Sequence, residues 1–304
     1  MVPVYPLLSS NKKKKHSRSR NQDPQRFHPF CRCPNHQLIC INHRVSVLSA
    51  LFPFKKTSRR FKSYHRDWLE SLRNRLLPRL CRSISAPTAS LDDLSAHVSA
   101  LLGHFQTYYA ALDRAAASPD QVPLLLDPPW RGPLERSFLF LGDLHPYLFT
   151  NLLRSLLDGD GSNDEYELGC NLDFNKDGQF VEKQWQTAMA WRNSSESLRP
   201  RIEEIERGLR LMLPALLGRM RAAQMRFVGH LAAGWPEDCG DEAAAAVIGE
   251  AAAEEMEELG RVLRDVNRLR HSTISEIVGA TTVYEAALFL QALGKFVIGL
   301  ASLD

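Results

Sequence analysis

The sequence predicts an all-α protein, a multi-helix bundle of about six to eight helices preceded by a disordered basic N-terminal tail. Beyond residue 60, apolar residues recur at the three- and four-residue spacing of amphipathic helices. Helix-capping residues stand before two of these segments, and no stretch shows the alternation of a half-buried strand. With 44% hydrophobic and 24% charged residues, the composition is ordinary for a globular protein.

The first helical segments lie between residue 63 and residue 115. One apolar stripe fades before Pro87 and consists of Trp68, Leu69, Leu72, Leu76, Leu77 and Leu80. Ser90 is a good N-cap for the next helix, and acidic Asp92 and Asp93 suit its first turn. Seven residues of that helix share one face and predict packing against other helices. They are Leu91, Leu94, Val98, Leu101, Phe105, Tyr108 and Leu112.

The middle of the chain predicts an aromatic, leucine-rich segment over 130–157, broken at Gly142-Asp143, and then an acidic insertion loop over 158–180. A long helix follows, whose inner face is expected to hold Ile202, Ile205, Leu209, Met212, Leu216, Met220 and Phe227. Another helix begins near Asp241 and ends near Gly279.

The last helix is introduced by Thr282, which forms a capping box with Glu285. Its apolar residues Ala286, Leu290, Leu293, Val297 and Leu300 are expected to point inward. The preceding helices carry acids on what we predict to be outer faces, free to meet partner proteins or simply to aid solubility. These acids are Glu203, Glu204, Glu254, Glu255, Glu257 and Glu258.

The charge is divided between two regions, a disordered basic extension over 1–60 and a helical domain over 61–304. The extension has 13 Lys and Arg residues against one acid, whereas the domain has 25 against 34. A basic tail suits nucleic acid, anionic lipid or an acidic partner, while an acidic body repels polyanions. One run within the tail predicts a localisation signal or a patch for anionic surfaces, unless it is only a solvated tail. It consists of Lys12, Lys13, Lys14, Lys15, Arg18 and Arg20.

A degenerate calcium loop is the sharpest local motif. Asp173, Asn175, Asp177 and Gly178 match an EF-hand loop, with Gln179 following the glycine. Residue Gln184 stands where a bidentate Glu belongs, so weak calcium binding competes with an ordinary polar turn. No cofactor is otherwise expected.

Other chemical motifs are weaker or missing. Five thiols and imidazoles lie close together in the tail, but their spacing matches no standard zinc site and chance remains the alternative. They are Cys31, Cys33, His36, Cys40 and His43. His97, His104 and His145 lie near apolar stripes, which favours core or rim positions. Because no P-loop, HExxH or GxSxG sequence is found, the protein is not expected to be an enzyme.

Three segments together resemble the delay-of-germination domain family, in that family's order. They are WLESLRNRLLPRL at 68–80, WRGPLERSFLFLGDLHPYLFTNLLRSLL at 130–157 and LRHSTISEIVGATTVYEAALFLQALGKFVIGL at 269–300. The family-motif residues of the central segment are Trp130, Glu135, Phe138, Gly142, His145 and Pro146. The turn at 140–147 and the run at 202–212 are similar to the inaperturate-pollen branch of this family.

That resemblance implies a scaffold in pollen aperture formation, marking plasma-membrane domains where wall is not deposited. Its partners would be other proteins, with peripheral membrane association, at the cytoplasmic side of the plasma membrane. The alternative is a nuclear, transcription-associated regulator of the dormancy or TGA type. Direct sequence-specific DNA binding is not expected, because prolines break the basic stretch and no leucine heptads follow it.

Overall fold

The computed structural model describes residues 58–86, 90–158, 179–234 and 241–302, without the side chains of 58–60, 158, 179–197 and 241–246. The helices in chain order are α2 (Ser58–Ser71), the π-helix η1 (Leu72–Leu76), α3 (Leu77–Ser85), α4 (Leu91–Ala115), the 3₁₀-helix η2 (Pro119–Gln121), α5 (Val122–Leu126), α6 (Pro133–Arg136), α7 (Tyr147–Asp158), α8 (Gln179–Gly234), α9 (Asp241–Ala280) and α10 (Val283–Leu300). Two short antiparallel strands, β1 (Leu139–Phe140) and β2 (Asp143–Leu144), stand between α6 and α7.

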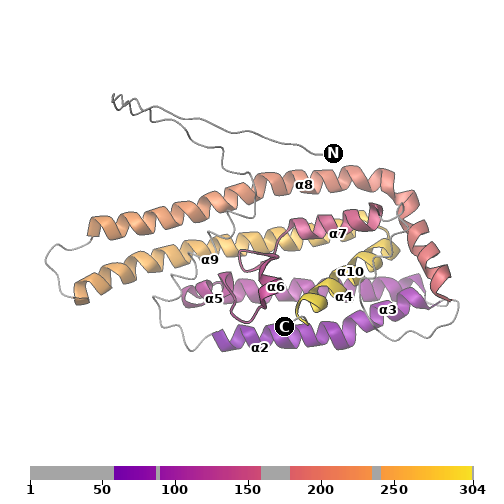
Figure 1. Ribbon diagram of the computed structural model, residues 1–304, viewed down its shortest axis with the longest axis horizontal. Helices are drawn as coiled ribbons and strands as arrows, with labels where there is room; N and C mark the ends of the chain where they lie inside the picture. The colour runs from indigo at the N-terminus through magenta and orange to yellow at the C-terminus, as the bar shows by residue number, and fades with distance from the viewer. Residues whose placement is uncertain (1–57, 87–89, 159–178, 235–240, 303–304) are drawn as a thin grey trace, which may run out of the picture.

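The helices form layers around one core. In Figure 1, α8 and α9 run side by side as a long antiparallel hairpin, and α2, α3 and α4 lie along the opposite side. Between these layers, α10 packs against α3, α4 and α7. The end of the hairpin near Gly234 projects beyond the other helices. The predicted all-α class is confirmed, with a small hairpin of strands that the sequence did not predict.

The continuous helical segment formed by α2, η1 and α3 contains a π-helical turn directly before Pro78. Leu77 donates its backbone N–H to the carbonyl of Leu72, five residues earlier, which is the π-helical spacing. Pro78 follows directly and offers no N–H, and its ring would crowd the carbonyl four residues before it. A wider turn relieves that crowding, so the helix continues through the proline.

Helix α4 confirms its predicted cap and most of its stripe. The Ser90 side chain accepts a hydrogen bond of 3.0 Å from the backbone N–H of Asp93. The stripe residues from Leu94 to Leu112 are buried, but Leu91 is 66% exposed, so its predicted place in the core is wrong. Periodicity gives the side of a helix that a residue faces, but burial also needs an element opposite. None of the described elements covers Leu91 in the first turn.

Two further predictions of burial are corrected in the α8–α9 hairpin. Met212 is 46% exposed, whereas Leu213 is buried, because the inner stripe of α8 steps by four residues from Leu209. Glu255 is 3% exposed and does not lie on an outer face. It stands four residues before buried Leu259, about one helical turn away, so the two side chains lie on the same side of the helix. Among the residues that the structure describes, neither carboxylate oxygen of Glu255 has a hydrogen-bond partner. Burial raises its pKa to about 7.

The final helix lies at the centre of the core. The capping box between Thr282 and Glu285 is formed, with each residue accepting a hydrogen bond from the other's backbone N–H. By length and mean hydropathy, α10 is the one helix of the described residues that could cross a membrane. More than half of it is buried against other helices, however, which is the environment of a core helix.

Candidate functional site

A buried ion cluster centred on Arg131 joins α4, α6 and β2. The Arg131 guanidinium donates hydrogen bonds to the Glu135 carboxylate, to the Tyr108 hydroxyl at 2.8 Å and to Asp143 Oδ1 at 3.1 Å. Asp143 Oδ1 also accepts a 2.8 Å hydrogen bond from the backbone N–H of Leu144. The side chains of Arg131, Glu135 and Asp143 are at most 5% exposed. The cluster therefore ties three elements together away from water.

The cluster sets the protonation of its neighbours. Burial opposes the charge of Arg131, but Tyr108, Asp143 and Glu135 together hold its pKa above the usual value. Burial, and then the charge of Asp143, raises the pKa of Tyr108, so its phenol keeps its proton and can donate. His65 is buried nearby, and burial and the positive Arg131 lower its pKa to about 2. At neutral pH, His65 is uncharged.

A second buried arginine, Arg270 of α9, holds the β1–β2 hairpin. Its guanidinium donates to the backbone carbonyls of Phe140, Leu141, Asp143 and Leu144, with distances of 3.3, 3.1 and 2.8 Å for the last three. It also donates to Asn267 Oδ1 at 2.7 Å. Arg270 has no exposed surface, and burial lowers its pKa. The Arg270 guanidinium thus supplies the hydrogen bonds that the carbonyls of this buried turn would receive from water at the surface.

The hairpin turn requires a glycine. Gly142 has a φ of +85°, in the left-handed region, and a Cβ at this position would lie 2.0 Å from the carbonyl oxygen of Leu125. Leu141 before it also has a positive φ, of 48°. Two successive positive φ values are typical of the turn that matches strand twist in two-residue hairpins. The break expected at Gly142-Asp143 is thus a tight reversal that lets the chain carry Asp143 into the ion cluster.

The remaining family-motif residues surround this hairpin. Phe138 packs edge-on against Phe296 of α10, with ring centroids 5.7 Å apart. His145 stacks on Tyr147 at 5.6 Å, and its Nδ1 accepts a 3.2 Å hydrogen bond from the backbone of Tyr147. Burial and the charge of Arg270 lower the pKa of His145 to about 4. Trp130 lies 6.1 Å from Phe61 of α2, and Pro146 is buried directly before α7.

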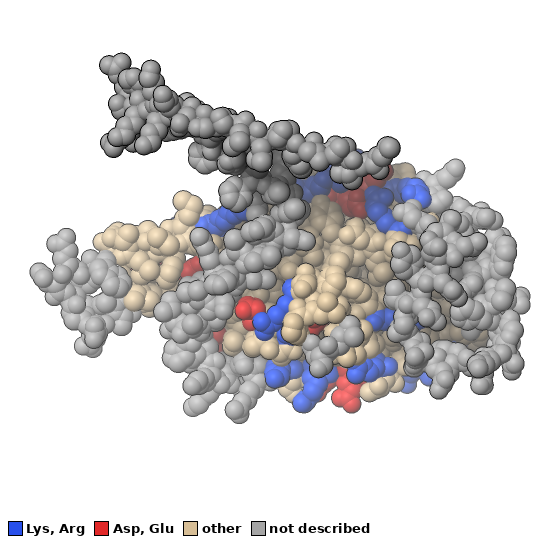
Figure 2. Space-filling view, viewed as in Figure 1, with Lys and Arg blue, Asp and Glu red and all other residues tan. Residues whose placement is uncertain are grey.

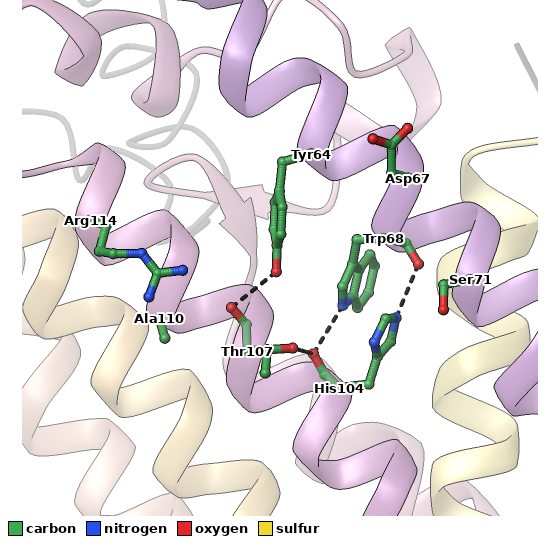
Figure 3. Close-up of a pocket in the computed structure, with 8 residues that line it drawn as sticks. All are labelled: Tyr64, Asp67, Trp68, Ser71, His104, Thr107, Ala110 and Arg114. Atoms are coloured by element: carbon green, nitrogen blue, oxygen red, sulfur yellow. Dashed lines mark hydrogen bonds between the residues drawn. The ribbon is translucent and has the colours of Figure 1, made fainter.

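A groove between α2 and α4 has a volume of about 490 Å³. Figure 3 shows the indole of Trp68 stacked on the imidazole of His104, with Tyr64 and Arg114 farther along the groove. The Trp68 and His104 rings are 4.9 Å apart, and each ring nitrogen hydrogen-bonds the other residue's backbone carbonyl at 3.0 Å. These paired contacts mainly fasten α2 to α4.

Several predicted sites lie outside the described residues. These include the localisation run (12–20), the cysteine and histidine cluster (31–43) and the calcium-loop residues Asp173, Asn175 and Asp177. Gln179 is the first residue of α8. Within the described ranges, no group of three or more His, Cys, Asp or Glu side chains could hold a metal ion. His97 hydrogen-bonds Ser83 at 2.8 Å and is half-buried.

Comparison with known proteins identifies the family of this chain. A family model described as seed dormancy control matches residues 72–155, which include the hairpin and the Arg131 cluster. The chain is 41% identical over 261 residues to Protein INAPERTURATE POLLEN1 of Arabidopsis thaliana, which covers 82% of this chain and 93% of that protein. It is 33% identical over 248 residues to the Protein INAPERTURATE POLLEN 1 homolog of Oryza sativa subsp. japonica, which covers 80% and 84%.

The chain belongs to the inaperturate-pollen family. The resemblance drawn from the three sequence segments is therefore confirmed. In this inaperturate-pollen protein, Arg270 comes from the Leu-Arg pair of the C-terminal segment, and the carbonyls it binds come from the central segment. Two motifs far apart in the sequence thus form one structural unit.

Sequence reasoning missed three residues of this unit, namely His65, Arg131 and Arg270. Two of them carried a readable signal. Arg270 stands four residues after Val266, and His65 stands three before Trp68, so each polar side chain lies on an apolar stripe. A charged or polar residue at such a position must find a partner inside the protein. Arg131 lies in a loop and gave no comparable signal.

Proposed function

We propose that this protein is a non-enzymatic interaction protein in pollen aperture formation, where it marks plasma-membrane domains on which pollen wall is not deposited. The observation that carries this proposal is its similarity, along most of its length, to proteins named inaperturate pollen. The branch-specific turn that suggested this role in the sequence includes Gly142 and Asp143, which the structure places in the hairpin.

The buried ionisable groups support a non-catalytic role. Glu135 and Asp143 both accept hydrogen bonds from Arg131, and Arg270 donates to backbone carbonyls and to Asn267. General acid–base chemistry needs a titratable group within reach of a substrate. Side chains enclosed in this way hold the fold together, so the outer surfaces are left to carry the function.

A basic edge supports membrane association. Four arginines lie within ten residues of η1 and α3, and no acid occurs between residues 71 and 91. They are Arg73, Arg75, Arg79 and Arg82. Three of them hydrogen-bond hydroxyl or backbone carbonyl oxygens, which leaves their charge unneutralised. In Figure 2, the neighbouring edge where α2 lies in Figure 1 carries Lys and Arg side chains with Asp and Glu side chains among them.

This edge suits the anionic inner surface of the plasma membrane. Each basic residue near such a surface contributes about 1 kcal/mol of attraction, so four add to whatever the N-terminal tail contributes. The opposite layer offers exposed carboxylates, among them Glu203, Glu204, Glu254 and Glu257, for partner proteins. We therefore place the protein at the cytoplasmic periphery of the plasma membrane, bound on one side to lipid and on the other to proteins.

The test is the location of fluorescently tagged full-length protein in developing pollen tetrads. We expect it at discrete plasma-membrane zones, and we expect those zones to weaken when Arg73, Arg75, Arg79 and Arg82 are all replaced by Gln. A matched control replaces four other arginines, Arg210, Arg261, Arg264 and Arg268, by Gln. Equal loss in both variants would show that only net charge matters, and a protein absent from membrane zones would contradict the aperture role.

Two observations favour a second candidate, a nuclear transcription-associated regulator. The matching family model is described as seed dormancy control, and the tail carries the Lys12–Arg20 basic run. Uniform nuclear fluorescence of the same tagged protein would support this candidate over the aperture role.

A further inference from the structure

The end of α3 places an exposed serine within the basic edge. Ser85 is the last residue of α3, and its side chain is exposed. Arg82 stands three residues before it and Arg79 six residues before it, and both are exposed. Among the described residues, the Ser85 hydroxyl has no hydrogen-bond partner. A free serine hydroxyl that follows arginine at this spacing is the charge pattern that basophilic protein kinases select.

The structure separates Ser85 from other hydroxyl groups at the same spacing. Two more residues with described side chains stand three positions after an arginine. Thr273 follows Arg270, but it is 2% exposed, and its hydroxyl donates to a backbone carbonyl at 2.7 Å. Ser63 follows Arg60, but it is half-buried within α2. Of these three hydroxyl groups, the one on Ser85 is exposed and lies at a helix end.

The last turn of α3 can open for a kinase with little loss of packing. A protein kinase binds its target segment in extended form, so this turn must unwind. After Leu80, no residue of α3 is buried, and the chain is already extended at Ala86, where ψ is 124°. The contacts that open are the 2.9 Å bond from the Ala86 N–H to the Arg82 carbonyl and the 2.8 Å bond between Ser83 and His97. Helix ends of this kind open locally without global unfolding.

We propose that Ser85 is a phosphorylation site of a basophilic serine kinase, and that its phosphate releases the basic edge from the membrane. The release rests on the proposed function, whereas the site does not. In the reaction, Ser85 Oγ forms a bond to the γ-phosphorus of ATP, and the bond from that phosphorus to the β–γ bridging oxygen breaks. ADP leaves with the electron pair, and the hydroxyl proton passes to the catalytic aspartate of the kinase.

A phosphate reverses the charge at this end of the basic edge. The end of α3 packs against α4, whose first turn carries exposed Asp92 and Asp93. These two acids balance Arg79 and Arg82, and a phosphate adds a charge of about −1.5 to −2. The Arg82 guanidinium, one helical turn from Ser85, can also bond the phosphate, which withdraws it from lipid. An anionic membrane surface then repels this end of α3.

Treatment of the full-length protein with a calmodulin-dependent protein kinase and ATP tests the site. This kinase selects an arginine three residues before its serine. By fragmentation mass spectrometry, we expect phosphate on Ser85 and none on Thr273. Arg82→Gln should slow phosphorylation of Ser85 about tenfold, because a charge-assisted contact to the kinase is lost. The matched control, Arg75→Gln, removes the same charge ten residues before the serine and should leave the rate unchanged.

Vesicles of equal parts phosphatidylcholine and phosphatidylserine test the release. Kinase-treated wild type and kinase-treated Ser85→Ala differ only in this phosphate, even where the kinase also modifies the N-terminal tail. The treated wild type should bind the vesicles about fivefold to thirtyfold more weakly than the treated variant, since the attraction of one or two basic residues is cancelled. Before treatment, the two proteins should bind alike.

The outcomes separate the site from the release. A protein that stays unphosphorylated at Ser85, while a standard peptide substrate in the same reaction is fully phosphorylated, overturns the site. Equal slowing by Arg82→Gln and Arg75→Gln overturns recognition through Arg82. Equal vesicle binding of the two treated proteins overturns the release but leaves the proposed function intact. Untreated protein that does not bind the vesicles overturns the release together with the proposed membrane association.

Discussion

Replacing Arg270 by Met should destabilise the protein more than any change at the surface of α9. The substitution keeps the length of the side chain but removes its hydrogen bonds to four hairpin carbonyls and to Asn267. Each buried carbonyl left unpaired costs about 1–3 kcal/mol, and this substitution removes the donor from four of them. Because some carbonyls can re-pair, we expect a loss of about 3–5 kcal/mol.

Thermal and urea unfolding followed by circular dichroism would measure this loss. For a chain of this size the expected fall in Tm is roughly 6–20 °C. Arg268→Met is the matched control, since Arg268 is two residues away on the same helix, 73% exposed, and paired with Asp265 at 3.1 Å. We expect that control to change stability by less than about 1 kcal/mol. A loss below about 1 kcal/mol for Arg270→Met would refute the reasoning, because the hairpin would then not depend on the arginine.

Three smaller predictions concern the turn, the buried acid and the last cap. Gly142→Ala should cost more than about 2 kcal/mol in urea unfolding, because the left-handed φ and the Leu125 carbonyl both oppose a Cβ; a cost below about 0.5 kcal/mol would contradict this. The raised pKa of Glu255 means that its contribution to stability is full below its usual pKa of 4.5 and is lost as the pH rises through about 7. Glu255→Gln should therefore match the wild type near pH 5 and exceed it near pH 8, and an equal difference at both would argue against a buried, titrating carboxylate. Thr282→Ala should cost about 1 kcal/mol by loss of the capping box, measured by thermal unfolding, whereas no loss would mean that Glu285 caps the helix alone.

Local features of the fold were predictable from sequence because they depend on residues within one or two helical turns. Ser90 and Thr282 were identified as caps, and both form the expected hydrogen bonds. The buried side of α4 followed from spacing, apart from Leu91 at its start. The family resemblance rests on the residues of three short segments, and the similarity to the inaperturate-pollen proteins confirms it.

The candidate site was predictable only in part. Trp130, Glu135, Gly142 and the other motif residues were named, but their roles were not, because a motif does not reveal what each residue contacts. Glu255 was expected on an outer face, although its spacing from Leu259 placed it on the buried stripe. In a run of glutamates, the residue type alone does not distinguish the one side chain that points into the core from those that point to solvent.

By itself, the sequence determined where two helices are capped, which side of most helices is apolar, and to which family the chain belongs. Tertiary structure alone decided that Arg270 holds a hairpin 126 residues away from it, and that Arg131 joins Tyr108 to Asp143. The physical reason is that periodicity and capping energies arise between near neighbours along the chain. The partner of a buried charge is set by which distant segments the core brings together.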